Sequence, residues 1–215
     1  TVYIDGVKMY DPSTPDNAFY AEGLFKDSID RIEILKGSQS SLYGNSAVAG
    51  TINIFTKKGK LGKHQNAAVR TGYDNTKDVF YSIDGADEKQ NYYMGFNYYS
   101  TDGISAMSND TEDDPYENNS LVANYGYKIS ENNTIENSLT LKDSYLKYDE
   151  PTAGRDDTKN SSDNFEAHYS FKFKNINNNF KNTFGISKSA TSRMITKYTG
   201  RESTYEGFKN MLTYL

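Results

Sequence analysis

Apolar and polar side chains alternate along most of the chain from Asn66 onward. Tyr92 and Met94, for example, fall on one side of an extended chain, and Asn97 falls on the other. A repeat of two residues is the periodicity of a β-strand. We therefore predict eight strands, at about residues 66–73, 79–86, 91–101, 119–129, 134–146, 163–174, 179–198 and 204–215. The seventh of these could instead be a hairpin near Ser189.

A sheet with one apolar face and one charged face fits two architectures. It is either a soluble sheet that buries one face, or a membrane barrel with lipid outside and water inside. The connections favour the barrel, because three short ones follow even-numbered strands while the long ones at residues 102–118 and 146–162 follow odd-numbered strands. Outer-membrane barrels likewise have short turns at one end and long loops at the other. Residues 74–78 are an exception, since this odd-numbered connection is also short.

Composition excludes several classes of protein. The hydrophobic content of 35% would suit a disordered chain, but 19 Tyr and 11 Phe supply the rings that disordered chains lack. A net charge of -5 leaves no basic surplus for nucleic acid, so no nucleic-acid partner is expected. The chain has no Cys, and His64 and His168 are far apart without a clustered carboxylate. We therefore predict that the protein is not an enzyme.

The first 56 residues have a mixed pattern that indicates a small α+β unit. Strands are expected in the VYIDGV segment around an Asp5-Gly6 turn, in RIEILKG and in TINIFTK. Between them, a helical turn would place Phe25, Ile29 and Ile32 on one face. The Lys- and Gly-rich segment that follows reads as a linker. The predicted organisation is therefore an amino-terminal unit, a linker and a strand-rich region, at residues 1–58, 59–65 and 66–215.

Residues 29–59 and the upstream VYIDGV segment closely resemble the carboxyl half of the plug domain of TonB-dependent outer-membrane receptors. The family pattern RIEVLKGP, SLYG, AIGGVINI and TKKG is met by residues 31–37, 41–44, 47–54 and 56–59. Ser38 replaces the usual Pro, and Ala49 replaces the first Gly of a pair. The resemblance is strong to Gly59 and looser beyond it. The residues that carry it are Arg31, Glu33, Lys36, Gly37, Tyr43, Gly44, Gly50 and Asn53.

The resemblance implies a mainly β protein, in which a partial plug precedes the first eight or so antiparallel strands of a larger transmembrane β-barrel. The charged side chains of Arg31, Glu33 and Lys36 are expected to meet a polar barrel wall. The first half of the plug and the TonB-contacting box are expected to lie outside this sequence. The implied location is the outer membrane of a Gram-negative bacterium. The implied partners are outer-membrane lipid, the TonB energy complex and a small nutrient ligand.

The acidic segment SNDTEDDPYENN is the best candidate for ligand chemistry, because hard oxygen ligands at such density suit calcium. The alternative is a solvated acidic loop, which such charge runs usually are. Tyr116 and Tyr148 are candidates for contact with the ligand. No cofactor is required, but a structural calcium ion is possible, with Asp156 and Asp157 as further ligands. The candidate calcium ligands are Asp110, Glu112, Asp113, Asp114 and Glu117.

The GIS segment, the acidic loop and ENNSL together resemble the cobalamin-receptor branch of the family, in which this region binds calcium and helps form the vitamin site. The expected function is thus TonB-dependent uptake of a corrinoid. A ferric siderophore or haem is the alternative cargo within the same family. A passive porin or a surface adhesin is the alternative from another class.

Overall fold

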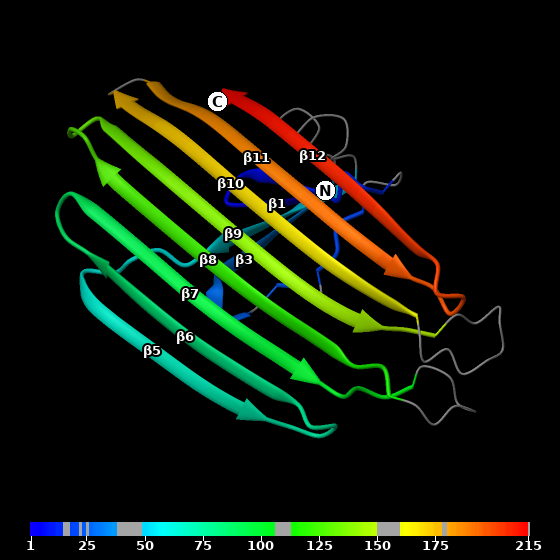
Figure 1. Ribbon diagram of the computed structural model, residues 1–215. Helices are drawn as coiled ribbons and strands as arrows, with labels where there is room; N and C mark the ends of the chain where they lie inside the picture. Colours follow the sequence, from blue (N-terminus) through cyan, green and yellow to red (C-terminus); the bar gives the residue numbers. More distant parts are fainter. Residues whose placement is uncertain are drawn as a thin grey trace.

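The computed structural model describes residues 1–14, 18–21, 23–24, 26–37, 49–105, 113–149, 160–177 and 180–214. Within these residues the chain forms a small sheet of four strands and a large sheet of eight. Figure 1 shows the large sheet as a continuous row of strands in chain order, with the small sheet behind it. None of the helical segments in these ranges is long and apolar enough to cross a membrane.

The small sheet contains β1 (Val2–Ile4), β2 (Val7–Met9), β3 (Ile29–Lys36) and β4 (Gly50–Thr56), in the order β2-β1-β4-β3. Strand β1 runs parallel to β4, and the other neighbours are antiparallel. Asp5 and Gly6 join β1 to β2 with φ angles of 48° and 77°. Two consecutive positive φ angles are what a tight two-residue hairpin turn requires. The strands and the Asp5-Gly6 turn expected from the sequence are therefore confirmed.

The helical turn expected around Ile29 is wrong in its extent. A 3-10 turn, η1, covers only Lys26–Ser28, and strand β3 begins directly at Ile29. Ile29 pairs with Thr56 and Ile32 pairs with Ile54, so these two side chains do not share a helical face. β-branched residues are restricted in helices and pack well in a pleated sheet, and pairing with β4 decides the outcome. Phe25 lies outside the described residues.

The large sheet is an antiparallel meander in which every strand pairs with its neighbours in sequence. All eight predicted strands are present. Ser189 pairs with both His168 and Lys209, so the seventh is one continuous strand and not a hairpin. The strands are β5 (Gly62–Thr71), β6 (Lys77–Ala86), β7 (Gln90–Thr101), β8 (Tyr116–Lys128), β9 (Asn133–Lys147), β10 (Ser161–Asn177), β11 (Phe180–Thr196) and β12 (Glu202–Tyr214).

The first of these strands begins earlier than the sequence pattern indicates. Strand β5 starts at Gly62, so the second half of the expected linker, residues 62–65, pairs with residues 83–86 of β6. These residues are Gly, Lys, His and Gln, and they carry no apolar alternation that could have marked a strand. Backbone pairing with β6 extends the strand without that signal. The linker is corrected to the few residues that follow Thr56 and precede Gly62.

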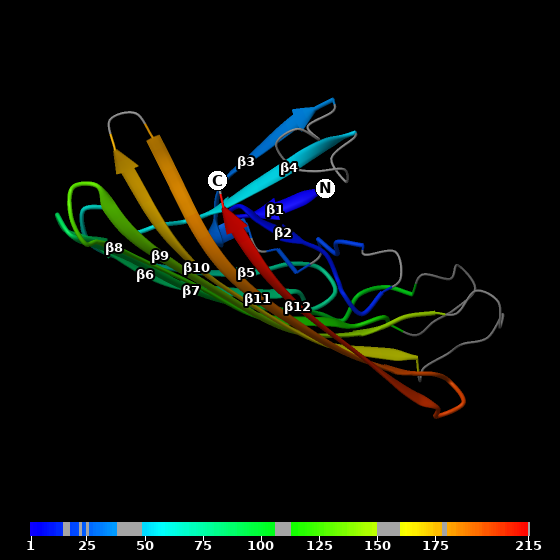
Figure 2. The same ribbon diagram turned by 90° about the horizontal axis from the view of Figure 1, so that it is seen from above.

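Side-chain exposure decides between the two architectures that the sequence leaves open. Apolar side chains of the large sheet are exposed, with Phe208 at 67% and Leu212 at 82%. Polar side chains on the opposite face are buried, with Asn97 at 1% and Ser189 at 2%. A soluble sheet buries its apolar face, so the polarity of this sheet is inverted. Figure 2 shows the small sheet on the concave side of the large one. Polar side chains of the large sheet make hydrogen bonds on that side.

Candidate functional site

The polar face of the large sheet binds the small sheet and its neighbouring turns through charged side chains. The guanidinium of Arg70 on β5 donates to both carboxylate oxygens of Asp27 in η1, each at 2.8 Å. It also donates to Asp78 on β6 at 2.8 Å. Bidentate arginine–carboxylate pairs combine strong hydrogen bonding with defined geometry. Arg70 therefore fixes the position of η1 on the large sheet.

A buried tyrosine reinforces the same attachment. The ring of Tyr93 on β7 is 2% exposed, and its hydroxyl lies 3.3 Å from the hydroxyl of Ser28 in η1. The Tyr93 ring lies over Gly95, where an added Cβ would be 2.5 Å from the tyrosine hydroxyl. Gly95 thus provides the space that allows Tyr93 to reach Ser28.

The junction where the chain passes from the small sheet to the large one is held by hydrogen bonds. Asp5 accepts from the Thr56 backbone N–H at 3.0 Å and from the Thr56 hydroxyl at 2.5 Å. The side-chain amide of Asn124 on β8 donates to the Thr56 hydroxyl and to the Lys57 carbonyl, both at 2.7 Å. Farther along, the backbone N–H of Lys60 donates to Asp84 on β6 at 3.1 Å. These contacts attach the end of β4 to the polar face.

Gly59 lies at the closest approach within this junction. A Cβ built at Gly59 would be 2.0 Å from the Gly85 carbonyl oxygen and 2.5 Å from the Tyr92 carbonyl oxygen. Contacts that short with backbone atoms cannot be relieved by rotating a side chain. Glycine is therefore required at this position for the chain to pass over β6 and β7.

A second attachment lies at the far side of the small sheet. Arg193 on β11 donates to Asp11 at 2.7 Å and to the Asn164 side chain on β10 at 2.8 Å. Its guanidinium also lies 4.9 Å from the centre of the Tyr20 ring. Asp11 is buried and additionally accepts from the backbone N–H and the hydroxyl of Ser13. The buried Asp11 carboxylate is therefore paired and hydrogen-bonded, as burial of a charge requires.

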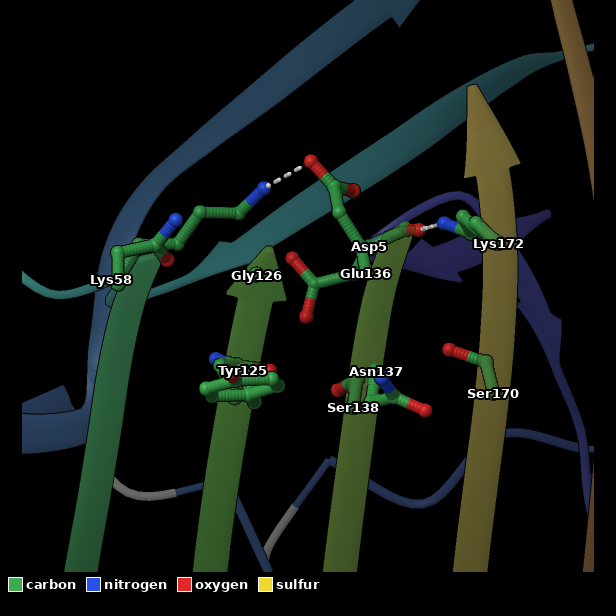
Figure 3. A pocket seen from close by; sticks show the side chains of 11 residues that line it. Asp5, Lys58, Tyr125, Gly126, Glu136, Asn137, Ser138, Ser170 and Lys172 are labelled. Atoms are coloured by element: carbon green, nitrogen blue, oxygen red, sulfur yellow. Dashed lines mark hydrogen bonds and ion pairs between the residues drawn. The ribbon is translucent and has the colours of Figure 1, made fainter. Parts of the chain in front are cut away.

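A pocket of about 340 Å³, open to solvent, lies at the short-turn end of this interface. Figure 3 shows Glu136 of β9 facing Lys58, which belongs to the junction, and Lys172 of β10 facing the turn at Asp5. Glu136 binds Lys58 at 3.0 Å and Lys174 at 2.8 Å. The ammonium of Lys172 donates to the Asp5 backbone carbonyl. The pocket thus has walls from both sheets and is lined by charged groups.

The residues of the predicted plug motif lie mainly on β3 and β4. Arg31 is exposed, and it binds Glu33 at 2.7 Å and Asp30 at 3.2 Å while its guanidinium stacks 3.8 Å from the centre of the Phe55 ring. The hydrogen bond to Glu33 raises the pKa of Arg31 above its ordinary value. In the described residues, the ion pairs of Arg31 and Glu33 are therefore local to the small sheet and do not reach the large sheet.

The remaining motif residues have backbone or packing roles. Lys36 is exposed at the end of β3, and Gly37 follows with a φ of 88° that favours glycine. Gly50 has a φ of 140°, and an added Cβ there would be 2.4 Å from the Leu35 carbonyl oxygen. Asn53 is buried and donates to the Thr51 hydroxyl at 3.3 Å. The other two motif residues, Tyr43 and Gly44, lie outside the described residues.

The candidate ligand-contact residues lie at the opposite, long-loop end of the large sheet. The rings of Tyr116 and Tyr99 are 5.9 Å apart, and the Tyr116 hydroxyl accepts from buried Asn118 at 2.6 Å. The Tyr148 backbone N–H binds the Asn160 carbonyl at 3.3 Å, just beyond the end of β9. Tyr116 and Tyr148 are therefore both at the bases of the long connections. Their contact with a ligand remains a prediction.

Only some of the candidate calcium ligands are among the residues that the structure describes. Glu117 lies on β8, and Asp113 and Asp114 lie three and two residues before the first residue of that strand. In the part of the chain that the structure describes, no three acidic or histidine side chains are grouped as a metal site. The predicted ligands Asp110 and Glu112 lie outside the described residues, together with Asp156 and Asp157. Calcium binding accordingly stays a prediction.

Sequence reasoning missed the residues that hold the two sheets together. Arg70, Asp84, Asn124 and Arg193 are recognisable in the sequence as polar members of alternating strands, but so are many others. Their partners on the small sheet, its turns and the junction are 24 to 182 positions away in the chain. The alternation therefore identifies the face that carries the contacts, whereas the contacts themselves depend on the fold. Asp149 was also missed; it accepts from Ser105 at 3.3 Å and so links the two long connections.

Comparison with known proteins identifies the amino-terminal unit. The family described as TonB-dependent Receptor Plug Domain matches residues 1–51, which include β1, β2 and β3 of the small sheet. Residues 1–51 are thereby identified as plug-domain sequence, and the chain as a whole is similar to TonB-dependent receptors. Its small sheet is thus part of the plug, and its large sheet corresponds to part of the barrel wall.

Two curated relatives show the range within this family. The chain is 26% identical over 123 residues to the Vitamin B12 transporter BtuB of Vibrio vulnificus, a match that covers 56% of this chain and 20% of the transporter. It is 32% identical over 79 residues to the ferric enterobactin receptor of Pseudomonas aeruginosa, covering 37% of this chain and 10% of the receptor. The matched part is therefore a fifth or less of each relative. Both relatives are described as a receptor or a transporter and not as an enzyme.

The fold is shared with solved receptors of the family. The siderophore receptor PirA of Acinetobacter baumannii matches with a TM-score of 0.80 and 14% sequence identity. The match covers 99% of this chain and 36% of PirA. This likeness confirms the mainly β fold, with a partial plug followed by antiparallel strands of a larger plugged barrel.

Proposed function

We propose that this chain forms part of an outer-membrane receptor that takes up a scarce nutrient by TonB-dependent active transport. The observation that carries the proposal is the inverted polarity of the large sheet around a segment matched by the plug family. Exposed Phe and Leu side chains suit contact with lipid, and buried Ser and Asn side chains suit a polar lumen. In this proposal the plug blocks the lumen until the TonB energy complex displaces it.

The polar interface supports a plugged receptor over a passive porin or an adhesin. The plug segment is attached to the sheet by the Arg70–Asp27 pair, the Arg193–Asp11 pair and the Asn124 hydrogen bonds. Charged and amide groups in such contacts can exchange their partners for water at modest net cost, which suits a part that must move. A core of interlocked apolar side chains would resist that movement.

The cargo that we propose is a corrinoid, with a ferric siderophore as the second candidate. The match to the B12 transporter is longer than the match to the ferric enterobactin receptor, at 123 against 79 residues. The second has the higher identity, at 32% against 26%, and a ferric aerobactin receptor of Klebsiella pneumoniae is 36% identical over 87 residues. The acidic segment at the long-loop end is proposed to bind calcium and thereby shape the cargo site.

The experiment is equilibrium binding of cobalamin and of ferric enterobactin to the intact receptor in detergent, each with calcium and with chelator. Cobalamin binding that is lost on chelation supports both the corrinoid and the calcium ion. Binding of the iron chelate alone would replace the corrinoid by the siderophore. Uptake of the bound cargo by cells with and without TonB then tests active transport, and uptake that is independent of TonB would contradict it.

A further inference from the structure

A second, larger pocket at the short-turn end is lined by an excess of cations. It has a volume of about 930 Å³, part of which is open to solvent. Its walls come from β3 and the junction on one side and from β9 and β10 on the other. We call it the lysine pocket after its four lysines, which are Lys58, Lys60, Lys172 and Lys174.

The carboxylates of the lysine pocket are already committed to other partners. Asp5 accepts two hydrogen bonds from Thr56, and Asp30 binds the neighbouring Arg31. Glu136 binds two of the four lysines, Lys58 and Lys174. Asp30 and Glu136 are thus ion-paired, whereas the partners of Asp5 are neutral and its carboxylate keeps its negative charge in the pocket wall.

Two ammonium groups are left without a carboxylate. No Asp or Glu of the described residues lies within ion-pair distance of Lys60 or Lys172. Lys60 is exposed, and the hydrogen bond at this residue is made by its backbone N–H. Lys172 is partly buried and donates to a neutral backbone carbonyl of Asp5. With Arg31, the lining carries five cationic side chains against three carboxylates, and this excess of positive charge in a partly enclosed pocket attracts an anion.

The cationic surface continues past Lys172. A neighbouring pocket of about 610 Å³ shares Lys172 and Lys174 and adds Lys181, and its lining contains no Asp or Glu. Ser170 and Thr183 provide hydroxyl donors there. Lysine binds phosphate as a point charge, and hydroxyl groups complete such sites with neutral hydrogen bonds.

From these observations we propose that the lysine pocket binds a small phosphate-bearing anion between the plug and the barrel wall. Lys60 and Lys172 supply ammonium groups that have no ion pair among the described residues. Lys58 and Lys174, which both bind Glu136, line the same pocket. The anion neutralises the junction at the short-turn end, away from the long loops. The site is independent of the cargo, so it stands or falls separately from the proposed transport function.

The test is phosphorus NMR titration of the intact receptor in detergent with inorganic phosphate, and with dihexanoyl phosphatidylglycerol as a soluble lipid headgroup. The Lys60→Gln and Lys172→Gln variants should each weaken binding by roughly tenfold or more, because each removes a charged hydrogen-bond donor. Lys128→Gln is the matched control, since Lys128 is exposed at the same end of the sheet and lines neither pocket.

Each outcome bears on the proposal. Binding of inorganic phosphate that depends on Lys60 and Lys172 supports it with free phosphate as the source, and the same dependence for the lipid alone supports it with a headgroup as the source. The proposal is overturned if neither anion binds, or if Lys128→Gln weakens binding as much as the pocket variants. Lys60 is exposed, so its variant keeps the test valid even if Lys172→Gln fails to fold.

Discussion

At the scale of residues, the interface depends on a few long-range charged contacts. Asp27 and Asp30 show the contrast, because they are three positions apart and both bind an arginine. Asp27 joins η1 to Arg70 of the large sheet with a side-chain exposure of 18%, whereas Asp30 binds adjacent Arg31 with an exposure of 52%. Exposed local pairs contribute little to stability, and partly buried bidentate pairs contribute more.

We therefore expect Asp27→Asn to lower the free energy of unfolding of the intact receptor by about 1–3 kcal/mol, because it removes a charge-assisted bidentate contact. Asp30→Asn, as the matched control, should change it by less than about 1 kcal/mol. Urea unfolding in detergent measures both. Equal losses in the two variants would show that the contact between Arg70 and Asp27 has no special role.

A turn residue gives a prediction about pH. Asp87, between β6 and β7, accepts backbone N–H bonds from Lys89 and Gln90, which lower its pKa below its ordinary value. A carboxyl group with a lowered folded-state pKa stabilises the protein above its unfolded-state pKa, and that contribution is lost as pH falls through the folded-state value.

The melting temperature of the receptor should consequently exceed that of Asp87→Asn at pH 7, and the difference should shrink as pH falls below about 4. Thermal unfolding followed by circular dichroism between pH 7 and pH 3 checks this. A difference that grows toward low pH would contradict the assignment.

At the scale of elements, the alternating pattern predicts strands well and contacts poorly. The eight strands of the large sheet were predicted to within a few residues because apolar and polar side chains alternate along each of them. The start of β5 was missed because residues 62–65 are Gly and polar residues, whose strand conformation comes from pairing with β6. Ile29 was assigned to a helical turn because local spacing cannot reveal its pairing with β4.

The junction gives a prediction about an element boundary. Gly59→Ala should destabilise the receptor by about 1–3 kcal/mol, since the new methyl group would overlap two backbone carbonyls of β6 and β7. Gly185→Ala is the control, because the nearest atom to its Cβ would be 3.6 Å away. Folded yield and urea unfolding measure the effect. Tolerance of alanine at Gly59 would mean that the junction does not pack against these strands as described.

The exposed apolar face of the large sheet gives a further prediction about stability. Phe96→Lys places a charge on the face proposed to contact lipid and should destabilise the receptor in lipid vesicles by about 2–4 kcal/mol near the bilayer centre. Glu88→Lys introduces the same side chain in the turn between β6 and β7 and should have little effect. If both variants are equally stable in vesicles, the Phe96 face does not contact lipid.

At the scale of the whole molecule, the polarity of the sheet is the feature that links fold to function. The sequence predicts two faces, and connection lengths favour the barrel, but the burial of the polar face depends on the small sheet lying on the concave side. The plug motif predicts the presence of the small sheet, because residues 29–59 resemble the plug domain of TonB-dependent receptors. The cargo is not predictable in the same way, because a cargo site depends on how the acidic side chains of the long connections come together. Of the candidate ligands, only Asp113, Asp114 and Glu117 are among the described residues.

The most direct test of the account measures which face of a strand contacts lipid. These 215 residues contain no Cys, so single cysteines at Ser138, Leu139, Thr140 and Leu141 of β9 can carry a spin label in the intact receptor reconstituted in a bilayer. We predict that labels at Leu139 and Leu141 collide with lipid-soluble oxygen, while labels at Ser138 and Thr140 do not. If oxygen reaches the labels at Ser138 and Thr140 instead, or reaches all four equally, the polar face of the large sheet is not the face that encloses the plug.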